Sequence, residues 1–558
     1  MKTDIVITGS GVAAAALAWK ILRANPKASI LVLEAGKKMK MRDFAIFQDY
    51  LVTNREPYRA YWDLPYQKKD QEGENQNIGG TEVPLYQARL TMYGGSTVHW
   101  GGWSFRLKEE DFHLQSNTGK GIDWPFDYHE LEPYYCEAEH YIGVSGHSQE
   151  VVTPRSAEYP FRAFPFTLED KLAIDALRKL NYRYSHLPIA RQGVSATISS
   201  HAPCQTTGKC KYCPFGARYV AANALDDLDS LEAHPNFSVR TEIVVEEILM
   251  SAKDHATGLR CFNRRTDQDE IIEAETIIVA SGAIESPKLL QRSGRPHWAN
   301  GIGNDSDLVG RNLVTHPYFI FESTIEKNPE ALQPEMGFPT LVSRHFDSPE
   351  EQAAGKFILV NPPDYPRYGK KNQDLMKLMQ AGRTTQEIKD AVRGEASVQW
   401  QGMLEVFSEH KNRVTSAKQI NHLGLRETIV DYSKDTEWFD SRLKEIQRHV
   451  ETIFKEMGAE GIRPQDVSWR ADHAACTTRM SHDPTAGVVD PDLKVHGVQN
   501  VYVCSNGSFS SLGAVNPTLT LTALSLRLAQ HLLEARGFAG TSSVLEAAPG
   551  DLALAALA

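Results

Sequence analysis

The chain has few cysteines, no excess of positive charge and no long apolar run. Seven cysteines among 558 residues are too few, and odd in number, for a disulfide framework. The formal net charge of −11 offers no positive field to phosphate backbones, which argues against nucleic acid as the main partner. The longest apolar run, around residues 12–19, is too short to span a membrane and belongs to an expected helix.

What is present is typical of a folded, multidomain protein. Apolar residues make up 41% and charged residues 23% of the chain, and its length predicts two or more domains. The first expected strand starts near residue 4, which leaves no room for a signal peptide. We therefore expect the protein to stay in the cytoplasm, or to reach the periplasm by co-export with a partner subunit.

A glycine-rich turn lies between an apolar strand and a helix-forming stretch in residues 4–36. Gly9, Gly11 and Ala14 form a G-x-G-x-x-A pattern, and a second strand over residues 30–33 ends at Glu34. Gly9 permits the tight turn, Gly11 lets the backbone approach a pyrophosphate, and Ala14 keeps the helix close to the strand. We expect the helix N-terminus to bind phosphate and Glu34 to bind a ribose, and the unit alone leaves NAD and FAD equally open.

Two later segments repeat the design of a β-branched strand that ends in small residues. They are residues 277–283 and 500–507, and a helix is expected from about residue 518 to 534. Small residues at strand ends let the backbone approach a ligand closely. We therefore expect a nucleotide domain assembled from discontinuous pieces, with further sheet segments at residues 397–407 and 426–432.

Six blocks occur in order along nearly the full chain. They are the opening fingerprint, residues 93–102 (YGGSTVHWGG), 280–287 (ASGAIESP), 308–317 (LVGRNLVTHP), 412–414 (NRV) and a closing block, 488–520, that ends in VNPTLT. In this order they resemble the glucose–methanol–choline (GMC) family of FAD oxidoreductases. The chain is most similar to the bacterial FAD-dependent sugar and glucoside dehydrogenases of that family.

The resemblance implies an α/β plus α+β fold. A discontinuous Rossmann-like FAD-binding domain would be joined to a substrate domain built on an antiparallel sheet. We assign residues 1–45, 85–115, 200–315 and 470–540 to the FAD-binding domain. Residues 46–84, 116–199 and 316–469 are assigned to the substrate domain and its lids, and 541–558 to a tail.

Alcohol oxidation by a flavin needs a hydride acceptor and a base for the hydroxyl proton. A base that is neutral at working pH suits histidine, and the family's catalytic histidine segment matches His473. The family's second catalytic position matches Asn516, which we expect to orient the substrate hydroxyl and to lie beside the cofactor. A buried structural histidine and a helix cap before Pro517 are the ordinary alternatives.

The cofactor should be FAD, and further residues are expected to contact it. These are Gly94, Gly95, Ser96, His99, Val245, Ser505 and Asn506. In a related pyranose-oxidising branch the histidine at the position of His99 carries a covalent flavin bond, whereas other sugar dehydrogenases have a similar loop without one. Where many family members carry an acidic residue, this chain has Cys504, Ser505 and Asn506, so the contacts there must be neutral or from the backbone.

Cys204, Cys210 and Cys213 lie within ten residues and end in a C-x2-C-P pattern. Such spacing is typical of metal or cluster ligands, and Lys209, Lys211 and Arg218 should favour thiolates. The bacterial sugar dehydrogenases that the chain resembles carry a three-iron cluster on three cysteines in this region, although their last two cysteines are one residue further apart. A [3Fe-4S] cluster, a Cys3His zinc site with His201, and thiols that are free or disulfide-linked are the three readings.

The predicted substrate is a sugar or glycoside, with the C3 hydroxyl of glucosides favoured and C1 next. Gln399 and Gln401 suit many hydroxyls, and Trp400 should stack on a sugar ring. A cluster implies electron transfer to a cytochrome c type acceptor and a small export subunit as partners. The alternatives are an FAD oxidase with a zinc or thiol site, and a flavoprotein, such as a lyase, that uses FAD structurally.

Overall fold

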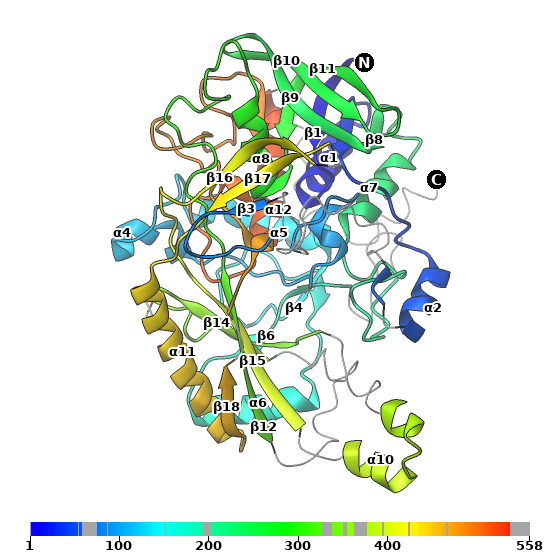
Figure 1. Ribbon diagram of the computed structural model, residues 1–558, viewed down its shortest axis with the longest axis vertical. Helices are drawn as coiled ribbons and strands as arrows, with labels where there is room; N and C mark the ends of the chain where they lie inside the picture. Colours follow the sequence, from blue (N-terminus) through cyan, green and yellow to red (C-terminus); the bar gives the residue numbers. More distant parts are fainter. Residues whose placement is uncertain are drawn as a thin grey trace.

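The computed structural model describes residues 2–53, 55–57, 75–85, 88–150, 152–192, 202–325, 338–349, 354–361, 376–392, 396–421, 424–464 and 467–535. The tail, residues 541–558, and His201 lie outside these ranges. Two seven-stranded sheets organise the described chain. In Figure 1 one sheet lies in the upper part of the molecule and the other in the lower part.

The upper sheet has the strand order β8-β2-β1-β11-β10-β9, and β20 pairs with the end of β11. β1 (Lys2–Thr8), β2 (Ile30–Glu34), β8 (Phe237–Thr241), β11 (Gln268–Val279) and β20 (Val501–Val503) are parallel. The hairpin of β9 (Ile243–Ala252) and β10 (His255–Asn263) extends β11 in antiparallel fashion. β1, β11 and β20 belong to the three segments that the sequence predicts to form one nucleotide domain. Although they are far apart in sequence, they are neighbouring parallel strands and end at the same edge of the sheet.

Helices cover this sheet closely because small residues face it. α1 (Val12–Ala24) begins with Ala13, Ala14, Ala15 and Ala16, all buried, and packs against α12 (Thr518–Ala535). α12 also packs on α5 (Tyr128–Ile142), and α8 (Gly282–Arg292) lies on β9. The run of alanines at the start of α1 lets this part of the helix approach the strands closely, as the sequence predicts for Ala14.

The lower sheet is antiparallel, with the order β18-β12-β15-β14-β13-β6, and β19 pairs with β12. β12 alternates strictly between buried and half-buried residues, the period-two pattern of a strand with one covered face. α11 (Thr436–Glu456) packs on α6, β12 and β18, as Figure 1 shows. The strands and α6 are β6 (Ser185–His186), β12 (Pro317–Ile325), β13 (Leu341–Ser343), β14 (Phe357–Asn361), β15 (Ala396–Leu404), β18 (Glu460–Pro464), β19 (Ser468–Trp469) and α6 (Leu168–Lys179).

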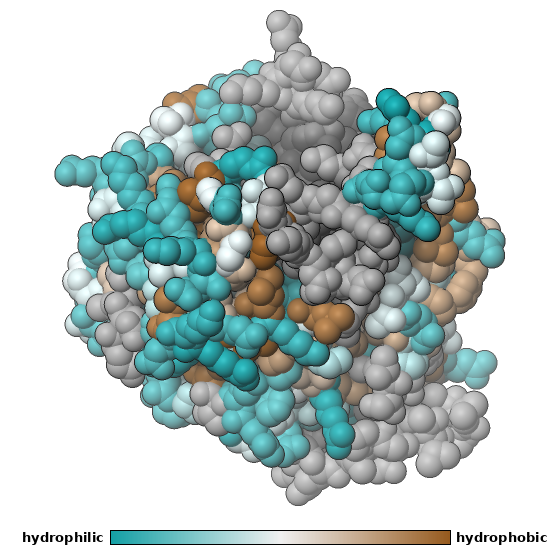
Figure 2. All heavy atoms as spheres, turned by 90° about the horizontal axis from the view of Figure 1, so that it is seen from below, coloured by the Kyte–Doolittle hydropathy of each residue, from teal (hydrophilic) through white to brown (hydrophobic). Residues whose placement is uncertain are grey.

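Two three-stranded sheets complete the architecture, with the orders β16-β17-β3 and β5-β4-β7. Their strands and the remaining helices are β3 (Asn75–Asn77), β4 (Val144–Gly146), β5 (Phe161–Arg162), β7 (Ile189–Ala190), β16 (Arg413–Ile420), β17 (Arg426–Asp431), α2 (Phe44–Thr53), α3 (Glu109–Phe112), α4 (Leu114–Thr118), α7 (Ala221–Asp229) and α10 (Thr385–Val392), with 3-10 turns η2 (Gly95–Val98), η3 (Ala471–His473) and η4 (Asn506–Ser508). The face seen in Figure 2 is mainly hydrophilic, with scattered hydrophobic patches. Within the described ranges, no helix combines the length and apolarity needed to cross a bilayer.

Candidate active site

A cavity of about 870 Å³ lies where the carboxyl ends of the parallel strands meet the antiparallel sheet. Most of the predicted site residues line it, although they come from distant parts of the chain. Those that line it are Gly9, Gly11, Glu34, Gly95, Ser96, His99, Cys210, Val245, Gln399, Gln401, His473, Ser505, Asn506 and Asn516. Gly94, Ala14, Trp400, Cys204 and Cys213 are not among the lining residues.

One end of the cavity is built by the turn between β1 and α1. Gly9 has a φ of +90°, and a Cβ there would lie 2.8 Å from the carbonyl oxygen of Ala280, so only glycine fits. At Gly11 a Cβ would meet nothing within 4 Å. Among the described residues, no side chain caps the start of α1, and its first turn holds no acidic residue. The unpaired N–H groups therefore offer an anion site, which fits the pyrophosphate of a dinucleotide.

Glu34 ties this turn to the glycine loop. Its carboxylate accepts hydrogen bonds from the Ser10 N–H at 3.1 Å, the Ser10 hydroxyl at 2.6 Å and the Gly36 N–H at 2.8 Å. The Ser10 hydroxyl oxygen in turn accepts from the Gly94 N–H at 3.0 Å. Gly94 thus holds the loop in place through its hydrogen bond to Ser10 and does not line the cavity. Gly95, Ser96 and His99 do line it. The ribose contact of Glu34 stays a prediction.

His473 and Asn516 come together at the other end of the cavity. The Asn516 amide nitrogen lies 3.3 Å from His473 Nε2, and the two rings of His473 and His316 meet edge to face with their Nδ1 atoms 3.1 Å apart. His316 Nε2 lies 2.9 Å from the carbonyl oxygen of Gly513, which only accepts hydrogen bonds. Neutral His316 therefore carries its proton on Nε2 and accepts at Nδ1.

This hydrogen-bond order fixes the tautomer of His473. Its Nδ1–H donates to His316, so its Nε2 keeps a lone pair that accepts from Asn516 and faces the cavity. Burial lowers the pKa of His473 to about 4. The pKa of His316 is lowered to about 3, mainly by burial and to a smaller extent by the neighbouring His473. Both rings are thus neutral near pH 7, as a proton-accepting imidazole requires.

Two polar atoms at this end point to a ligand. The side-chain oxygens of Asn516 and Asn506 are buried and have no hydrogen-bond partner among the described residues. Since buried polar atoms are normally satisfied, a cofactor or substrate donor fits here. Arg470 and Asp472 form a two-point ion pair beside His473, and Arg470 lies over the Tyr318 ring at 5.0 Å.

His316 is the residue that the motif reading missed. It lies in one of the six blocks, but no pattern in the sequence pairs it with a histidine 157 residues later. Tyr318, Arg470 and Asp472, which line the cavity, were likewise not singled out. The sequence could have pointed to them only through their positions, which lie within three residues of His316 or His473.

The antiparallel sheet presents Gln399 and Gln401 of β15 to the cavity, as the alternation predicts. Gln401 is paired with Ile320 of β12, which lines the same wall as Tyr318. The prediction that Trp400 stacks on a sugar ring is wrong for this structure. Trp400 is 0% exposed because alternation along β15 places it on the face opposite Gln399 and Gln401, and there it belongs to the hydrophobic core.

The cysteine segment lies next to the glycine loop. The buried Arg218 guanidinium donates to the carbonyls of Thr97, Val98 and Trp100 on one side, and to those of Cys210 and Lys211 on the other. Cys210 also lines the cavity. The guanidinium therefore joins the loop expected against the flavin to the segment that carries the thiols.

The three cysteines are free thiols, which excludes a disulfide among them in this structure. Within the described part of the chain, their three sulfur atoms are not all within 4.8 Å of one another. A tetrahedral zinc needs sulfurs about 3.8 Å apart, given Zn–S bonds of about 2.3 Å. The cluster and the zinc site both stay predictions, and His201, the fourth ligand of the zinc prediction, lies outside the described residues.

The expected effect of neighbouring cations on these thiols is wrong for Cys204. Burial raises its pKa, and this outweighs the opposing effect of Arg191. The three cations named from the sequence are engaged elsewhere: Arg218 binds carbonyls, Lys211 pairs with Glu56 at 2.6 Å, and Lys209 lies over the Tyr50 ring. A metal would have to supply the charge that stabilises the thiolate.

His99 lines the cavity, and burial lowers its pKa to about 4. Its ring is therefore neutral near pH 7. A packing role beside the flavin and a covalent bond to it both remain predictions.

Comparison with known proteins identifies the family of the chain. Two family models, both described as GMC oxidoreductase, match residues 4–318 and 359–525. The chain is 28% identical to the fructose dehydrogenase large subunit of Gluconobacter japonicus, covering 96% of this chain and 98% of that one. It is also 28% identical to the 6'''-hydroxyparomomycin C oxidase of Streptomyces lividus, over 79% of each chain.

A solved structure of formate oxidase from Aspergillus oryzae has the same fold, with a TM-score of 0.64 at 16% identity, covering 96% of this chain and 99% of that one. The family matches span most of the chain and include both ends of the cavity. The chain therefore belongs to the GMC family of FAD oxidoreductases.

Proposed function

We propose that this enzyme oxidises a secondary alcohol of a sugar or glycoside, with the C3 hydroxyl of glucosides favoured and C1 next. The observation that carries the proposal is the lone pair on His473 Nε2, which faces the cavity beside Asn516. Gln399 and Gln401, which line the same cavity, would supply the amide donors and acceptors that a polyhydroxylated substrate needs. The names of two similar proteins, a fructose dehydrogenase and a paromamine oxidase, support a sugar-like substrate.

FAD, when bound, supplies the acceptor for the hydrogen that leaves carbon as hydride. The turn at Gly9 and Gly11 and the start of α1 would hold its pyrophosphate, and the Gly95–Ser96 loop would lie against its ring system. Asn516 would donate an amide N–H to the oxygen of the substrate hydroxyl, and that hydroxyl would replace the Asn516 amide nitrogen as the partner of His473 Nε2. His473 Nε2 accepts the hydroxyl proton as the carbonyl of the product forms, and His316 keeps that nitrogen free of a proton before the reaction.

We also propose that Cys204, Cys210 and Cys213 bind an iron–sulfur cluster, [3Fe-4S] in type, through which electrons leave to a protein acceptor of the cytochrome c type. The bridge of Arg218 between the glycine loop and Cys210 supports this path. The relative named a large subunit supports a multi-subunit enzyme, and we propose a small partner subunit here.

An oxidase that passes electrons to oxygen is the second candidate, and the oxidases among the similar proteins favour it. The two candidates separate on iron content, on the electron paramagnetic resonance spectrum of the oxidised protein and on peroxide formation. An iron-free protein that forms peroxide rapidly would contradict the cluster.

The position of oxidation follows from the products. The purified enzyme is incubated anaerobically with a panel of hexoses and glucosides, and the products of those that reduce the flavin are identified by NMR. We expect a 3-keto glucoside. A product oxidised at C1 supports the alternative position, and a product oxidised at a primary alcohol would contradict oxidation of a ring position.

The pH dependence tests the protonation state of His473. With its pKa lowered to about 4 by burial, Nε2 is protonated only below that pH and loses its lone pair there. We expect kcat/KM for the sugar to be flat from pH 8 down to about pH 5 and to fall near pH 4. An apparent pKa near 6.5 would mean that His473 is not held neutral by its surroundings.

His316 is predicted to act as a positioning residue. His316→Ala leaves the His473 Nδ1–H without its buried acceptor, a loss of about 1–3 kcal/mol that corresponds to about a 5- to 150-fold fall in kcat. KM should change little, and the pH profile should shift because the tautomer is no longer fixed. His316→Gln, which offers an amide oxygen, should recover part of the rate. An alanine variant with the wild-type rate and pH profile would remove His316 from this role.

A further inference from the structure

Away from the cavity, two histidines and a glutamate from separate segments come together. His147 follows directly after β4, Glu150 lies three residues later, and His186 is in β6. One ligand atom from each residue lies within 4.8 Å of the others, and the catalytic site uses none of the three. His147 is exposed, whereas Glu150 and His186 are half-buried, so the group is open to solvent on one side.

Hydrogen bonds hold the candidate ligand side chains in position before any ion binds. Glu150 lies 2.8 Å from His186 Nδ1 through one carboxylate oxygen, and its other oxygen accepts from the His186 backbone N–H at 2.7 Å. The Glu150 N–H donates to the His147 carbonyl at 3.1 Å and closes the turn that brings both side chains to one side. The ring of His186 stacks on Phe166 at 3.8 Å and on His147 at 5.1 Å. Binding of an ion would therefore cost little conformational entropy, because the side chains are already held in position.

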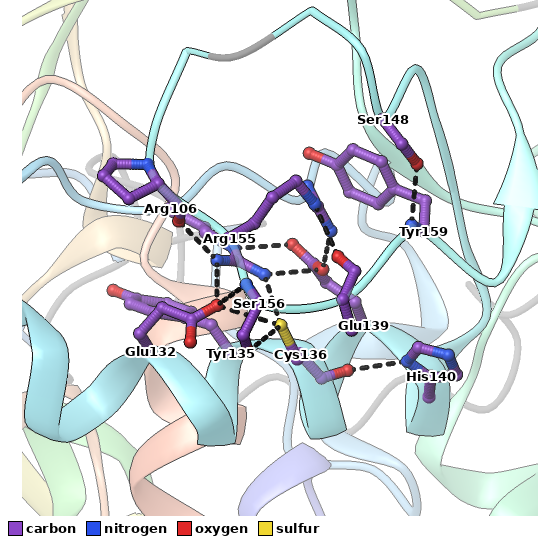
Figure 3. A network of polar contacts seen from close by, with 12 residues as sticks. Arg106, Glu132, Tyr135, Cys136, Glu139, His140, Ser148, Arg155, Ser156 and Tyr159 are labelled. Carbon is purple, nitrogen blue, oxygen red and sulfur yellow. Dashed lines mark hydrogen bonds and ion pairs between the residues drawn. The ribbon is translucent and has the colours of Figure 1, made fainter. Parts of the chain in front are cut away.

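The segment that carries His147 and Glu150 is held by hydrogen bonds and an ion pair to α5 and to its own later residues. Figure 3 shows the Ser148 hydroxyl accepting from the Tyr159 N–H, and Arg155 reaching from the same segment to Glu139 of α5. Arg155 also lies over the Tyr159 ring at 3.6 Å, and the Ser156 N–H donates to Glu132. Glu139 is 0% exposed and is held by the buried Arg106. This buried network gives the turn a rigid base.

The donor set selects the kind of ion. Two imidazoles and one carboxylate suit zinc and similar transition metals, whereas calcium and magnesium prefer oxygen ligands. Ligands about 2.0–2.2 Å from zinc lie about 3.3 Å apart, within the span of these donor atoms. A simple ion pair between Glu150 and His186 would have no need of His147.

We propose that His147, Glu150 and His186 bind one Zn²⁺ ion, or a similar divalent transition metal ion, with water in the fourth position. The ion links two sheets, because β4 belongs to the three-stranded sheet β5-β4-β7 and β6 is the edge strand of the antiparallel sheet. β7 begins three residues after β6 and leads to Arg191, which lines the cavity. The site is therefore a structural staple behind one wall of the substrate cavity.

Isothermal titration of the FAD-loaded enzyme with Zn²⁺ tests the site. We expect His147→Ala to bind one equivalent fewer than the wild type, or to bind it at least about 100-fold more weakly, since even an indirect ligand partner is worth about 10- to 100-fold. His129→Ala is the matched control, because His129 is exposed beside Glu109 at 3.5 Å as a histidine–glutamate pair. It should bind like the wild type.

Cobalt gives a second readout that separates this site from the thiols. Co²⁺ bound to nitrogen and oxygen ligands absorbs in the visible region without a sulfur-to-cobalt charge-transfer band. This sulfur-free absorption should appear in the wild type and in His129→Ala and be lost in His147→Ala. Equal stoichiometry, affinity and cobalt spectra in the wild type and His147→Ala would overturn the proposal.

Discussion

Replacing His473 with alanine is expected to slow anaerobic flavin reduction by the sugar about 100- to 10,000-fold, the usual contribution of a positioned general base. The reason is that Nε2 of His473 is the one proton acceptor that the hydrogen bonds of Asn516 and His316 prepare in this part of the described site. Stopped-flow absorbance of the bound flavin measures this rate directly.

His482→Ala is the matched control for that variant. His482 lies nine residues further along, and its Nε2 contacts the carbonyl of Pro125 at 2.9 Å, away from the cavity lining. It should reduce its flavin at the wild-type rate. Flavin content must be equal in all three proteins, and reduction of His473→Ala at the wild-type rate would show that another group takes the proton.

Replacing Cys210 with alanine should separate the two halves of turnover. Iron and its resonance signal should be lost, and electron transfer to a cytochrome c type acceptor should fall to near background, because the proposed cluster loses a ligand. Reduction of the flavin by sugar should stay close to the wild-type rate, since the proton acceptor and the substrate wall are untouched. Iron content, cytochrome reduction and flavin bleaching measure the three quantities.

Cys261→Ala controls for the loss of a buried thiol. Cys261 is a free, fully buried cysteine in β10, outside the cysteine segment. It should keep its iron and its cytochrome activity. A Cys210→Ala protein that retains wild-type iron and cytochrome reduction would contradict the cluster, whereas one that loses flavin reduction as well would show that the thiol supports the flavin site instead.

The parts of the fold that depend on local sequence could be predicted. Gly9 has a positive φ and no room for a Cβ, as the glycine pattern predicts, and β11 ends at Val279, directly before the small residues 280–283. His473 and Asn516 could be identified because their segments match a family pattern. In the structure the Asn516 amide nitrogen lies 3.3 Å from His473 Nε2.

What the sequence could not provide depends on long-range packing. Strand alternation assigned Trp400 to one face of β15, but only the positions of neighbouring elements show that this face is core. Arg218 was expected to act on thiols, yet its guanidinium is taken up by five carbonyls from two segments. The contact of His316, directly before β12, with His473 of η3 arises only in the folded chain.

The most direct test of the proposed function is anaerobic mixing of the FAD-loaded enzyme with a glucoside, followed by the absorbance of the flavin. We expect the flavin to bleach, and we expect replacement of the reacting carbon-bound hydrogen with deuterium to slow the bleaching, because hydride leaves carbon in that step. A flavin that stays oxidised with every sugar and glycoside tried would contradict the account and would favour a structural role for FAD.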